Sequence, residues 1–144
     1  MFLLDTNVVS ELRKVRSGKA DKNLARWADS VDASELYISV ITLQELEIGV
    51  MLMERRNNPR GQVLRMWFEN YVLPAFRGRV LPVDTAVARR GAGLHVPDPS
   101  PVRDSLIAAT ALVHGMTVVT RNVSDFERTG VPTINPWMKS SARR

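Results

Sequence analysis

The sequence predicts an α/β protein: a three-layer α/β/α sandwich built on a mostly parallel sheet. Short apolar segments rich in sheet-forming residues alternate along the chain with longer segments whose apolar residues recur every three or four positions. Alternating strands and helices are typical of a parallel sheet with helices on both faces. A length of 144 residues suits one domain. We expect that domain at 1–137 and a flexible basic tail at 138–144.

The N-terminal segment predicts one strand and two helices. Residues 2–4 are apolar and favour a strand. Asp5 is a helix-capping residue type, and apolar residues at helical spacing follow it over 8–12. Residues 13–22 are polar, basic and interrupted by a glycine, so we expect a loop there. A second helix is expected at 24–30.

The middle of the chain predicts a second strand and two long helices. Residues 36–39 contain types that favour sheets. Over 41–56 the apolar residues recur at steps of three and four, which predicts an amphipathic helix. Residues 57–61 contain two asparagines, a proline and a glycine, so we expect the helix to end there. Another helix is expected at 63–76.

The remaining elements complete the predicted sheet. A third short strand is expected at 79–81, between a glycine and a proline, and a helix at 84–94. A capping serine and a proline predict a helix whose first position is 101 and which runs to 113. This helix is apolar on nearly every face and should be buried. Gly115 ends it, and a fourth strand follows at 117–120.

Composition limits the classes of function. The chain has 20 Lys and Arg against 15 Asp and Glu, a net charge of +5, which modestly favours a polyanionic partner. It has no cysteine, which excludes disulfides and thiolate zinc sites. No stretch of about 18 uncharged apolar residues occurs, and the N-terminus does not resemble a signal peptide. We therefore expect a cytoplasmic protein with no membrane contact.

Four acidic residues in different settings are the main functional signal. Asp5 and Asp125 follow predicted strands, and Glu45 lies about one turn into a helix that leaves another strand. Asp104 is near the start of the helix that leads into the fourth strand. The end of this helix lies at the amino edge of the sheet, so its start, about 16 Å away by helix rise, lies at the carboxyl edge. All four should therefore meet at the carboxyl edge of the sheet, where ligands bind in open α/β folds. Clustered carboxylates repel one another unless a cation such as Mg²⁺ holds them.

Each acid also has a structural explanation. Asp5 is a suitable helix cap, and Asp104 suits the dipole at a helix N-terminus. Glu45 forms a capping box with Thr42, and Asp125 lies in a second capping box, so for these two taken singly the structural explanation is the commoner one. The functional hypothesis depends on all four acids together.

The sequence also resembles a known family. Five segments carry the resemblance: 4–7 (LDTN), 38–46 (ISVITLQEL), 104–111 (DSLIAATA), 119–126 (VTRNVSDF) and 134–137 (INPW). Together they are similar to the signature of PIN-domain nucleases, and more narrowly to the VapC and FitB toxins of type II toxin–antitoxin pairs. The resemblance covers residues 1–137.

The resemblance implies an endoribonuclease that depends on Mg²⁺ or Mn²⁺. The acidic tetrad of the family corresponds to Asp5, Glu45, Asp104 and Asp125. We expect Asp5 and Asp104 to be the principal metal ligands, and Glu45 and Asp125 to hold a second ion or to orient the attacking water.

The resemblance also suggests partners and the residues that position the substrate. Thr6 and Asn122 correspond to positions beside the metal, and basic residues such as Arg13 and Arg121 are expected to guide the RNA backbone. Members of this family are usually homodimers. Each is bound by a small VapB-type antitoxin in a hetero-oligomer that reaches promoter DNA only through the antitoxin.

Two other functions remain open at this stage. The first is a PIN domain that cleaves DNA or acts as an interaction partner without catalysis. A phospho-acceptor receiver domain also places an acidic pocket at the edge of such a sheet, and Asp84 follows the third predicted strand. That fold needs a lysine after its last strand, whereas Lys139 lies beyond the expected sheet and the other acids would be unexplained.

Overall fold

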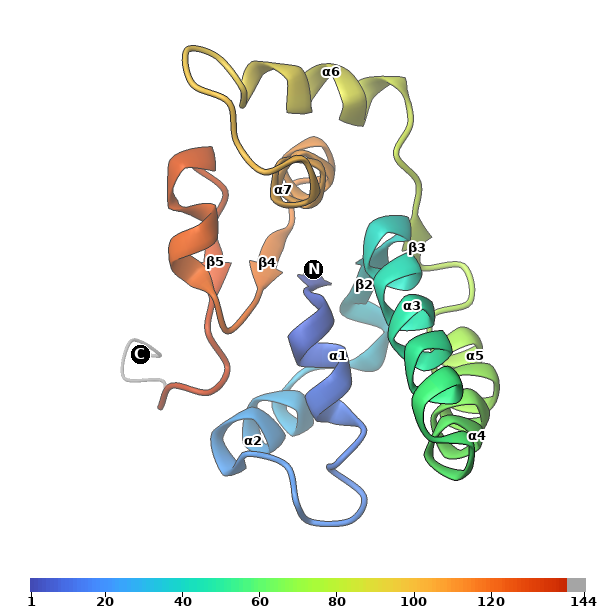
Figure 1. The fold of residues 1–144 in the computed structure, drawn as a ribbon. Coiled ribbons are helices and arrows are strands. Elements are labelled where there is room, and N and C mark those ends of the chain that lie inside the picture. Colours follow the sequence, from blue (N-terminus) through green and yellow to red (C-terminus); the bar gives the residue numbers. More distant parts are fainter. Residues whose placement is uncertain (140–144) are drawn as a thin grey trace.

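The protein is built on one parallel five-stranded sheet, as a computed structural model that describes residues 1–139 shows (Figure 1). Every pairing between neighbouring strands is parallel, and the strand order is β3-β2-β1-β4-β5. The strands are β1 (Phe2–Leu4), β2 (Leu36–Ser39), β3 (Val80–Leu81), β4 (Thr117–Val119) and β5 (Thr133–Ile134).

Helices connect the strands in the described part of the chain. Those before β3 are α1 (Thr6–Leu12), α2 (Lys22–Ser30), η1 (Ala33–Glu35), α3 (Val40–Arg56), α4 (Asn58–Trp67), η2 (Phe68–Val72) and α5 (Leu73–Ala75). Those after β3 are α6 (Thr85–Gly93), α7 (Val102–His114) and η3 (Val123–Thr129). The η2 segment is a π-helical turn that joins α4 to α5.

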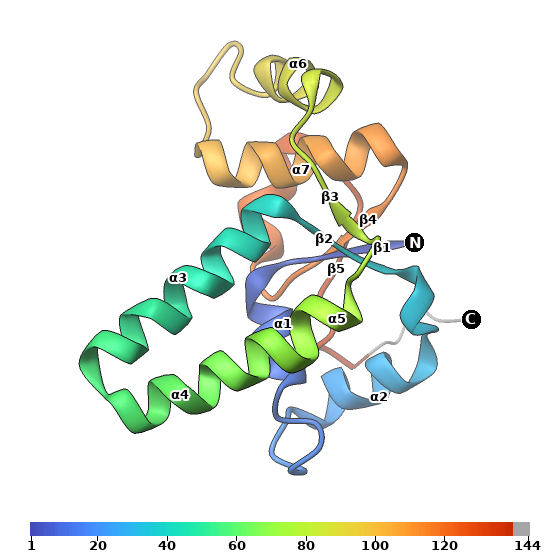
Figure 2. The ribbon, with the colours of Figure 1, turned by 90° about the vertical axis from the view of Figure 1, so that its right-hand side faces the viewer.

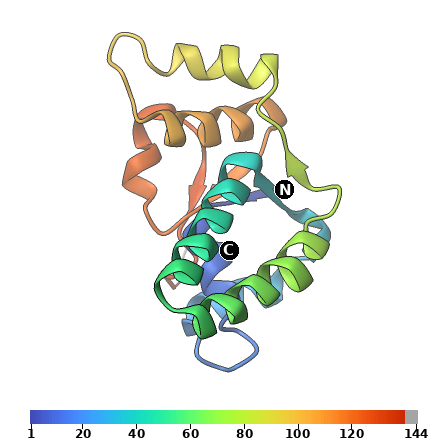
Figure 3. The ribbon, with the colours of Figure 1, turned by 45° about the vertical axis from the view of Figure 1, so that its right-hand side comes forward.

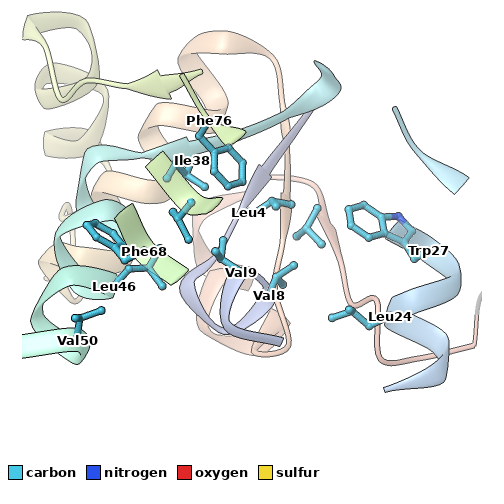
Figure 4. Close-up of a cluster of buried hydrophobic side chains, with 12 residues drawn as sticks. Leu4, Val8, Val9, Leu24, Trp27, Ile38, Leu46, Val50, Phe68 and Phe76 are labelled. Atoms are coloured by element: carbon cyan, nitrogen blue, oxygen red, sulfur yellow. The ribbon is translucent and has the colours of Figure 1, made fainter. Parts of the chain in front are cut away.

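Alternating residues of the strands divide the core into two clusters, one on each face of the sheet. Leu4 and Val119 belong to the first cluster, which α1, α2, α3, α4, η2 and α5 cover (Figure 4). Leu3 and Val118 belong to the second, against α7 and η3. Because successive strand residues point to opposite faces, the sheet lies between two helical layers. The predicted α/β/α sandwich is therefore confirmed.

The strand order creates a topological switch beside β1. The chain passes from β1 to β2 and β3 on one side, then crosses through α6 and α7 to β4 on the other side. The carboxyl ends of β1 and β4 are adjacent, with Leu4 paired to Val119. In open α/β sheets this is where ligands bind. Gly115 ends α7 in the left-handed conformation, at φ 66°, as predicted.

Three details of the secondary structure differ from the prediction. Helix α3 ends at Asn57 as predicted, but the next helix begins at Asn58 and not at residue 63, because the side chain of Asn57 accepts the backbone N–H of Arg60 and caps α4. Helix α7 begins at Val102, so Pro101 is its N-cap and not its first residue. The fifth strand, β5, was missed because it is only two residues long and lies among prolines, which an edge strand tolerates.

Two further expectations concern the tail and membranes. Met138 and Lys139 are exposed, and residues 140–144 of the predicted tail lie outside the described residues. Within residues 1–139, none of the helices combines the length and the apolar character needed to cross a membrane.

Helices α3 and α4 form a hairpin that extends away from the sheet (Figures 2 and 3). An ion-pair network joins them: Arg65 of α4 contacts Glu54 at 2.9 Å and Glu47 at 2.7 Å, both in α3. Gly61 of α4 is buried directly against Glu54, and a Cβ atom there would lie 2.3 Å from the Cα of Glu54. The hairpin therefore requires a residue without a side chain at position 61.

Gly61→Ala should destabilise the protein. The added Cβ meets backbone and not a flexible side-chain end, so the two helices have to separate, which typically costs about 1–3 kcal/mol. Urea denaturation of the variant measures this loss. Gly49→Ala is the matched control, because a Cβ at that helical glycine meets nothing within 4 Å. It should raise the free energy of unfolding by about 0.5–1 kcal/mol. Equal behaviour of the two variants would contradict the close approach.

Candidate active site

Asp5 lies at the carboxyl end of β1 and is almost completely buried, with 1% of its surface exposed. Its Oδ1 accepts the backbone N–H of Thr6 at 2.8 Å, so the residue does cap α1. Its Oδ2 accepts the hydroxyl of Thr120, which follows β4, at 2.7 Å. Capping therefore explains only part of its surroundings: the side chain also faces the switch between β1 and β4.

Glu45 projects from α3 toward the same edge of the sheet. The predicted capping box is wrong, because Ser39 caps α3 through the backbone N–H of Ile41, and the buried hydroxyl of Thr42 has no hydrogen-bond partner. Glu45 instead accepts the hydroxyl of Thr6 at its Oε1. The side chain is thus directed away from its own helix end and toward α1.

The side chain of Arg103, in the first turn of α7, joins three acids from separate elements. Its Nε donates to Glu45 at 2.5 Å, and its Nη1 donates to Asp104 at 2.7 Å. Its Nη2 donates to Asp5. Asp5, Glu45 and Asp104 therefore share one positive group. The predicted convergence of these three carboxylates at one edge of the sheet is what the structure shows.

The contacts between Arg103 and Glu45 favour the charged form of both side chains. Partial burial alone would raise the pKa of Glu45, but hydrogen bonds from Arg103 and Thr6 outweigh it and lower that pKa below the ordinary value. Burial alone would lower the pKa of Arg103, but hydrogen bonding to Glu45 and the charge of Asp5 raise it. The guanidinium and the Glu45 carboxylate are therefore both charged at neutral pH.

Asp125 is not brought into this cluster. It lies in η3, where its side chain is exposed, and the hydrogen bonds and ion pairs of the other three acids do not include it. Its capping-box explanation also fails, because no side chain caps η3. Its assignment to the acidic site stays a prediction that requires η3 to turn its carboxylate inward.

A cavity of about 550 Å³ opens over the cluster. Polar and acidic residues form one part of its wall and apolar residues of α3 form another; the lining residues are Asp5, Thr6, Asn7, Glu45, Ile48, Gly49, Leu52, Arg103 and Asn122. Both residues that were predicted to lie beside a metal, Thr6 and Asn122, line this cavity. The cavity therefore gives a ligand room beside Asp5 and Glu45.

The chemistry of the donor set suits a hard divalent cation. The cluster offers carboxylate oxygens of Asp5, Glu45 and Asp104 and the hydroxyl of Thr6, which are ligand types that Mg²⁺ and Mn²⁺ prefer. Within residues 1–139, however, no three acidic or histidine side chains are arranged to hold a metal as they stand. The guanidinium of Arg103 lies among the carboxylates and occupies the position of a cation.

The two predicted basic residues, Arg13 and Arg121, each contact an aromatic ring. Arg13 stacks over Trp67, with 5.9 Å between its Cζ and the ring centroid, and Arg121 stacks over Trp137 at 5.0 Å. The backbone N–H of Arg121 donates to Asn7, a residue of the cavity wall. Arg121 is therefore near the cavity, and a role for either arginine in binding RNA stays a prediction.

Sequence reasoning missed two residues of the site. Thr120 could have been found, because it follows β4 directly and Asp5 follows the strand that pairs with β4. Arg103 carried only a weak signal: a positive residue next to the acid in the first turn of a helix. Nothing in the spacing indicates that its side chain reaches across to α1 and α3.

Thr120→Val should lower stability through the site. Valine preserves the side-chain shape but removes the hydroxyl that donates to Asp5, so a buried carboxylate oxygen loses its closest donor. The expected loss is about 1–3 kcal/mol in the free energy of unfolding, measured by urea denaturation. Thr117→Val, at the half-buried first residue of β4, is the control and should cost less. A Thr120→Val protein as stable as the control would contradict this role.

Comparison with known proteins agrees with the geometry. The family model described as PIN domain matches residues 2–132. The VapC ribonuclease Y4jK of Sinorhizobium fredii is 39% identical over 142 residues, which is 95% of this chain and 98% of the relative. The toxin FitB of Neisseria gonorrhoeae is 38% identical over 143 residues, covering 95% of this chain and 99% of the relative.

Solved structures show the same fold. A structure of FitAB bound to an IR36 DNA fragment contains a chain that superimposes with a TM-score of 0.88 at 35% identity. The match covers 99% of this chain and 99% of that one. The likeness therefore extends over the sheet, both helical layers and the segments that carry the acids.

Proposed function

This chain belongs to the PIN-domain family, and from that premise we propose that it is the ribonuclease toxin of a type II toxin–antitoxin pair. In this proposal it is an endoribonuclease that hydrolyses phosphodiester bonds of RNA with Mg²⁺ or Mn²⁺. The observation that carries the proposal is the convergence of Asp5, Glu45 and Asp104, from three separate elements, on the guanidinium of Arg103. Asp5, Glu45 and Arg103 also line one cavity.

Asp5 and Asp104 would be the principal ligands of the cation, and Glu45 would complete the site. A bound divalent cation makes a coordinated water more acidic and stabilises charge on the scissile phosphate. Thr120 and the backbone N–H of Thr6 fix the orientation of Asp5, and Thr6 also holds Glu45. These contacts set the ligand geometry in advance, as outer-shell hydrogen bonds do in metal sites.

A cleavage assay with the purified chain tests the proposal. Single-stranded RNA should be cut with Mg²⁺ or Mn²⁺ and left intact with a chelator, and added metal should restore cutting. Single-stranded DNA of the same sequence tests the alternative that the chain acts on DNA. We favour RNA because relatives that cover most of this chain are named ribonucleases. Cutting that continues unchanged in the chelator would reject the metal-dependent mechanism.

We also propose that an antitoxin binds an apolar groove beside α1. Two adjoining hollows share Leu12, Arg13, Trp67 and Tyr71 in their walls, and Tyr71 is 52% exposed. The similarity to a chain in a FitAB complex supports such a partner. Leu46 and Val50 of α3 are buried in the first core cluster and are therefore not available to such a partner.

Coexpression tests the antitoxin proposal. The product of a small open reading frame beside the gene should copurify with the chain and suppress RNA cleavage. Tyr71→Ala should weaken this complex while leaving free cleavage activity unchanged, because Tyr71 is not part of the acidic cavity. A neighbouring product that neither binds nor inhibits would contradict the pairing.

We propose in addition that two copies of the chain associate. Several large apolar side chains are exposed on the α3–α4 hairpin: Ile48, Met51, Leu52, Val63 and Met66. Exposed apolar residues that gather on one part of a surface are typical of an interaction site. Light scattering of the purified chain should give twice the monomer mass, and a monomer at all concentrations would contradict this arrangement.

A further inference from the structure

Arg103 occupies the centre of the acidic cluster in a manner that neither a helix cap nor a surface ion pair explains. All three of its donor nitrogens are engaged: Nε with Glu45, Nη1 with Asp104 and Nη2 with Asp5. Its Nη2 also lies 3.4 Å from the hydroxyl of Thr6. A planar fork of donors matched to several carboxylates is a geometry that arginine, and not lysine, provides.

The charges in the cluster do not balance. One guanidinium carries a single positive charge, while Asp5, Glu45 and Asp104 together can carry three negative charges. Arginine does not lose its proton in proteins, so the guanidinium can leave the carboxylates only by moving. A divalent cation at the same place would neutralise more of the charge. The guanidinium and a metal ion therefore cannot both occupy the space among the carboxylates.

We propose that Arg103 is an internal cation that holds the acidic site together without metal and must swing out before a divalent cation can bind. This inference rests on the proposed metal-dependent function. It explains why the three carboxylates converge and yet, within residues 1–139, are not arranged to hold a metal as they stand. It makes Arg103 a residue that sets metal affinity, through competition for the same carboxylates.

The surroundings of Arg103 allow this movement. Its side chain is 33% exposed, and the residue lines the cavity of about 550 Å³ over the cluster. It belongs to the first turn of α7, and the groups that its guanidinium contacts are all side chains. Rotation of the side chain into the cavity would therefore leave the backbone hydrogen bonds of α7 intact. A permanent structural clamp, by contrast, would make the metal site unavailable whenever the protein is folded.

Metal titration of variants at position 103 tests the proposal. Calorimetry should show that Arg103→Ala binds Mn²⁺ about tenfold more tightly than the unaltered chain or more, because a competing cation has been removed. Arg103→Lys keeps the charge and should bind Mn²⁺ with an affinity closer to that of the unaltered chain. Arg26→Ala, which removes an exposed arginine of α2, should leave the affinity unchanged.

Thermal denaturation supplies a readout that is independent of calorimetry and of activity. In a chelator Arg103→Ala should melt below the unaltered chain, because its carboxylates repel one another without a counter-charge. Saturating Mn²⁺ should raise the melting temperature of Arg103→Ala more than that of the unaltered chain. If Arg103→Ala does not fold without metal, Arg103→Gln, which keeps an amide donor, replaces it in both measurements.

The outcomes separate this inference from the proposed function. If the unaltered chain binds Mn²⁺ and the neutral variants at position 103 bind it no more tightly, Arg103 is a structural clamp and the inference is overturned. If neither the unaltered chain nor any variant binds Mn²⁺, the metal-dependent function itself fails. Tighter Mn²⁺ binding by Arg103→Ala or Arg103→Gln, with unchanged binding by Arg26→Ala, supports both.

Discussion

Asp5→Asn is expected to lower RNA cleavage by more than about 100-fold while the protein stays folded, because substitutions that only disturb the outer shell of a metal site already cost 10- to 100-fold. Asparagine has nearly the same shape and can still cap α1 through its side-chain oxygen. It removes the negative charge at the most buried acid of the cluster, which is 1% exposed. Gel assays of RNA cleavage at saturating Mg²⁺ measure the loss.

A second capping aspartate provides the control for this result. The side chain of Asp84 accepts the backbone N–H of Val87 and caps α6, so Asp84→Asn makes the same chemical change at another helix N-terminus. It should retain full cleavage activity. If a folded Asp5→Asn protein cut RNA at the rate of Asp84→Asn, the assignment of Asp5 to the metal site would be wrong.

Phe126→Ala should lower the free energy of unfolding by about 3–5 kcal/mol, a large part of the stability of a single domain. Phe126 is fully buried in the second core cluster and anchors η3 beneath α7. Its removal also frees the segment that carries Asp125 and follows Asn122. Cleavage activity per folded molecule should therefore decrease as well. Urea denaturation measures the loss of stability, and RNA assays at low temperature measure the cleavage activity.

Phe76→Ala separates the two effects. Phe76 is also buried, but it belongs to the first core cluster, on the other face of the sheet (Figure 4). We expect a comparable loss of stability with normal cleavage activity per folded molecule. Equal activity of the folded Phe126→Ala and Phe76→Ala proteins would indicate that η3, and with it Asp125, contributes nothing to the reaction.

The positions of the strands could be predicted because their signals are local. Asp5 follows the apolar residues of β1, those of β4 lie between Gly115 and Asn122, and the helix after β1 shows apolar residues at helical spacing. By contrast, β5 consists of only Thr133 and Ile134, and its pairing with Val118 and Val119 is a tertiary contact that no local pattern contains. The start of α4 was missed because Asn57 acts as the end of one helix and the cap of the next.

The same distinction applies to the site. Asp5, Glu45 and Asp104 could be placed together from topology, because the carboxyl ends of parallel strands share one edge. The direction of a side chain is harder to infer than the position of its backbone. Arg103 reaches the acids of α1 and α3 only through a long side chain, and the neighbours that decide its direction are distant in sequence. Asp125 lies at a suitable backbone position, yet its side chain is exposed.

Anomalous X-ray diffraction from crystals soaked in Mn²⁺ tests the central claim most directly. A single strong peak should lie among the carboxylates of Asp5, Glu45 and Asp104, with the guanidinium of Arg103 turned away into the cavity. The peak should disappear in crystals of the Asp5→Asn protein. If saturating Mn²⁺ gave no peak among these side chains while the same protein preparation cleaved RNA, the carboxylate cluster would not be the metal centre.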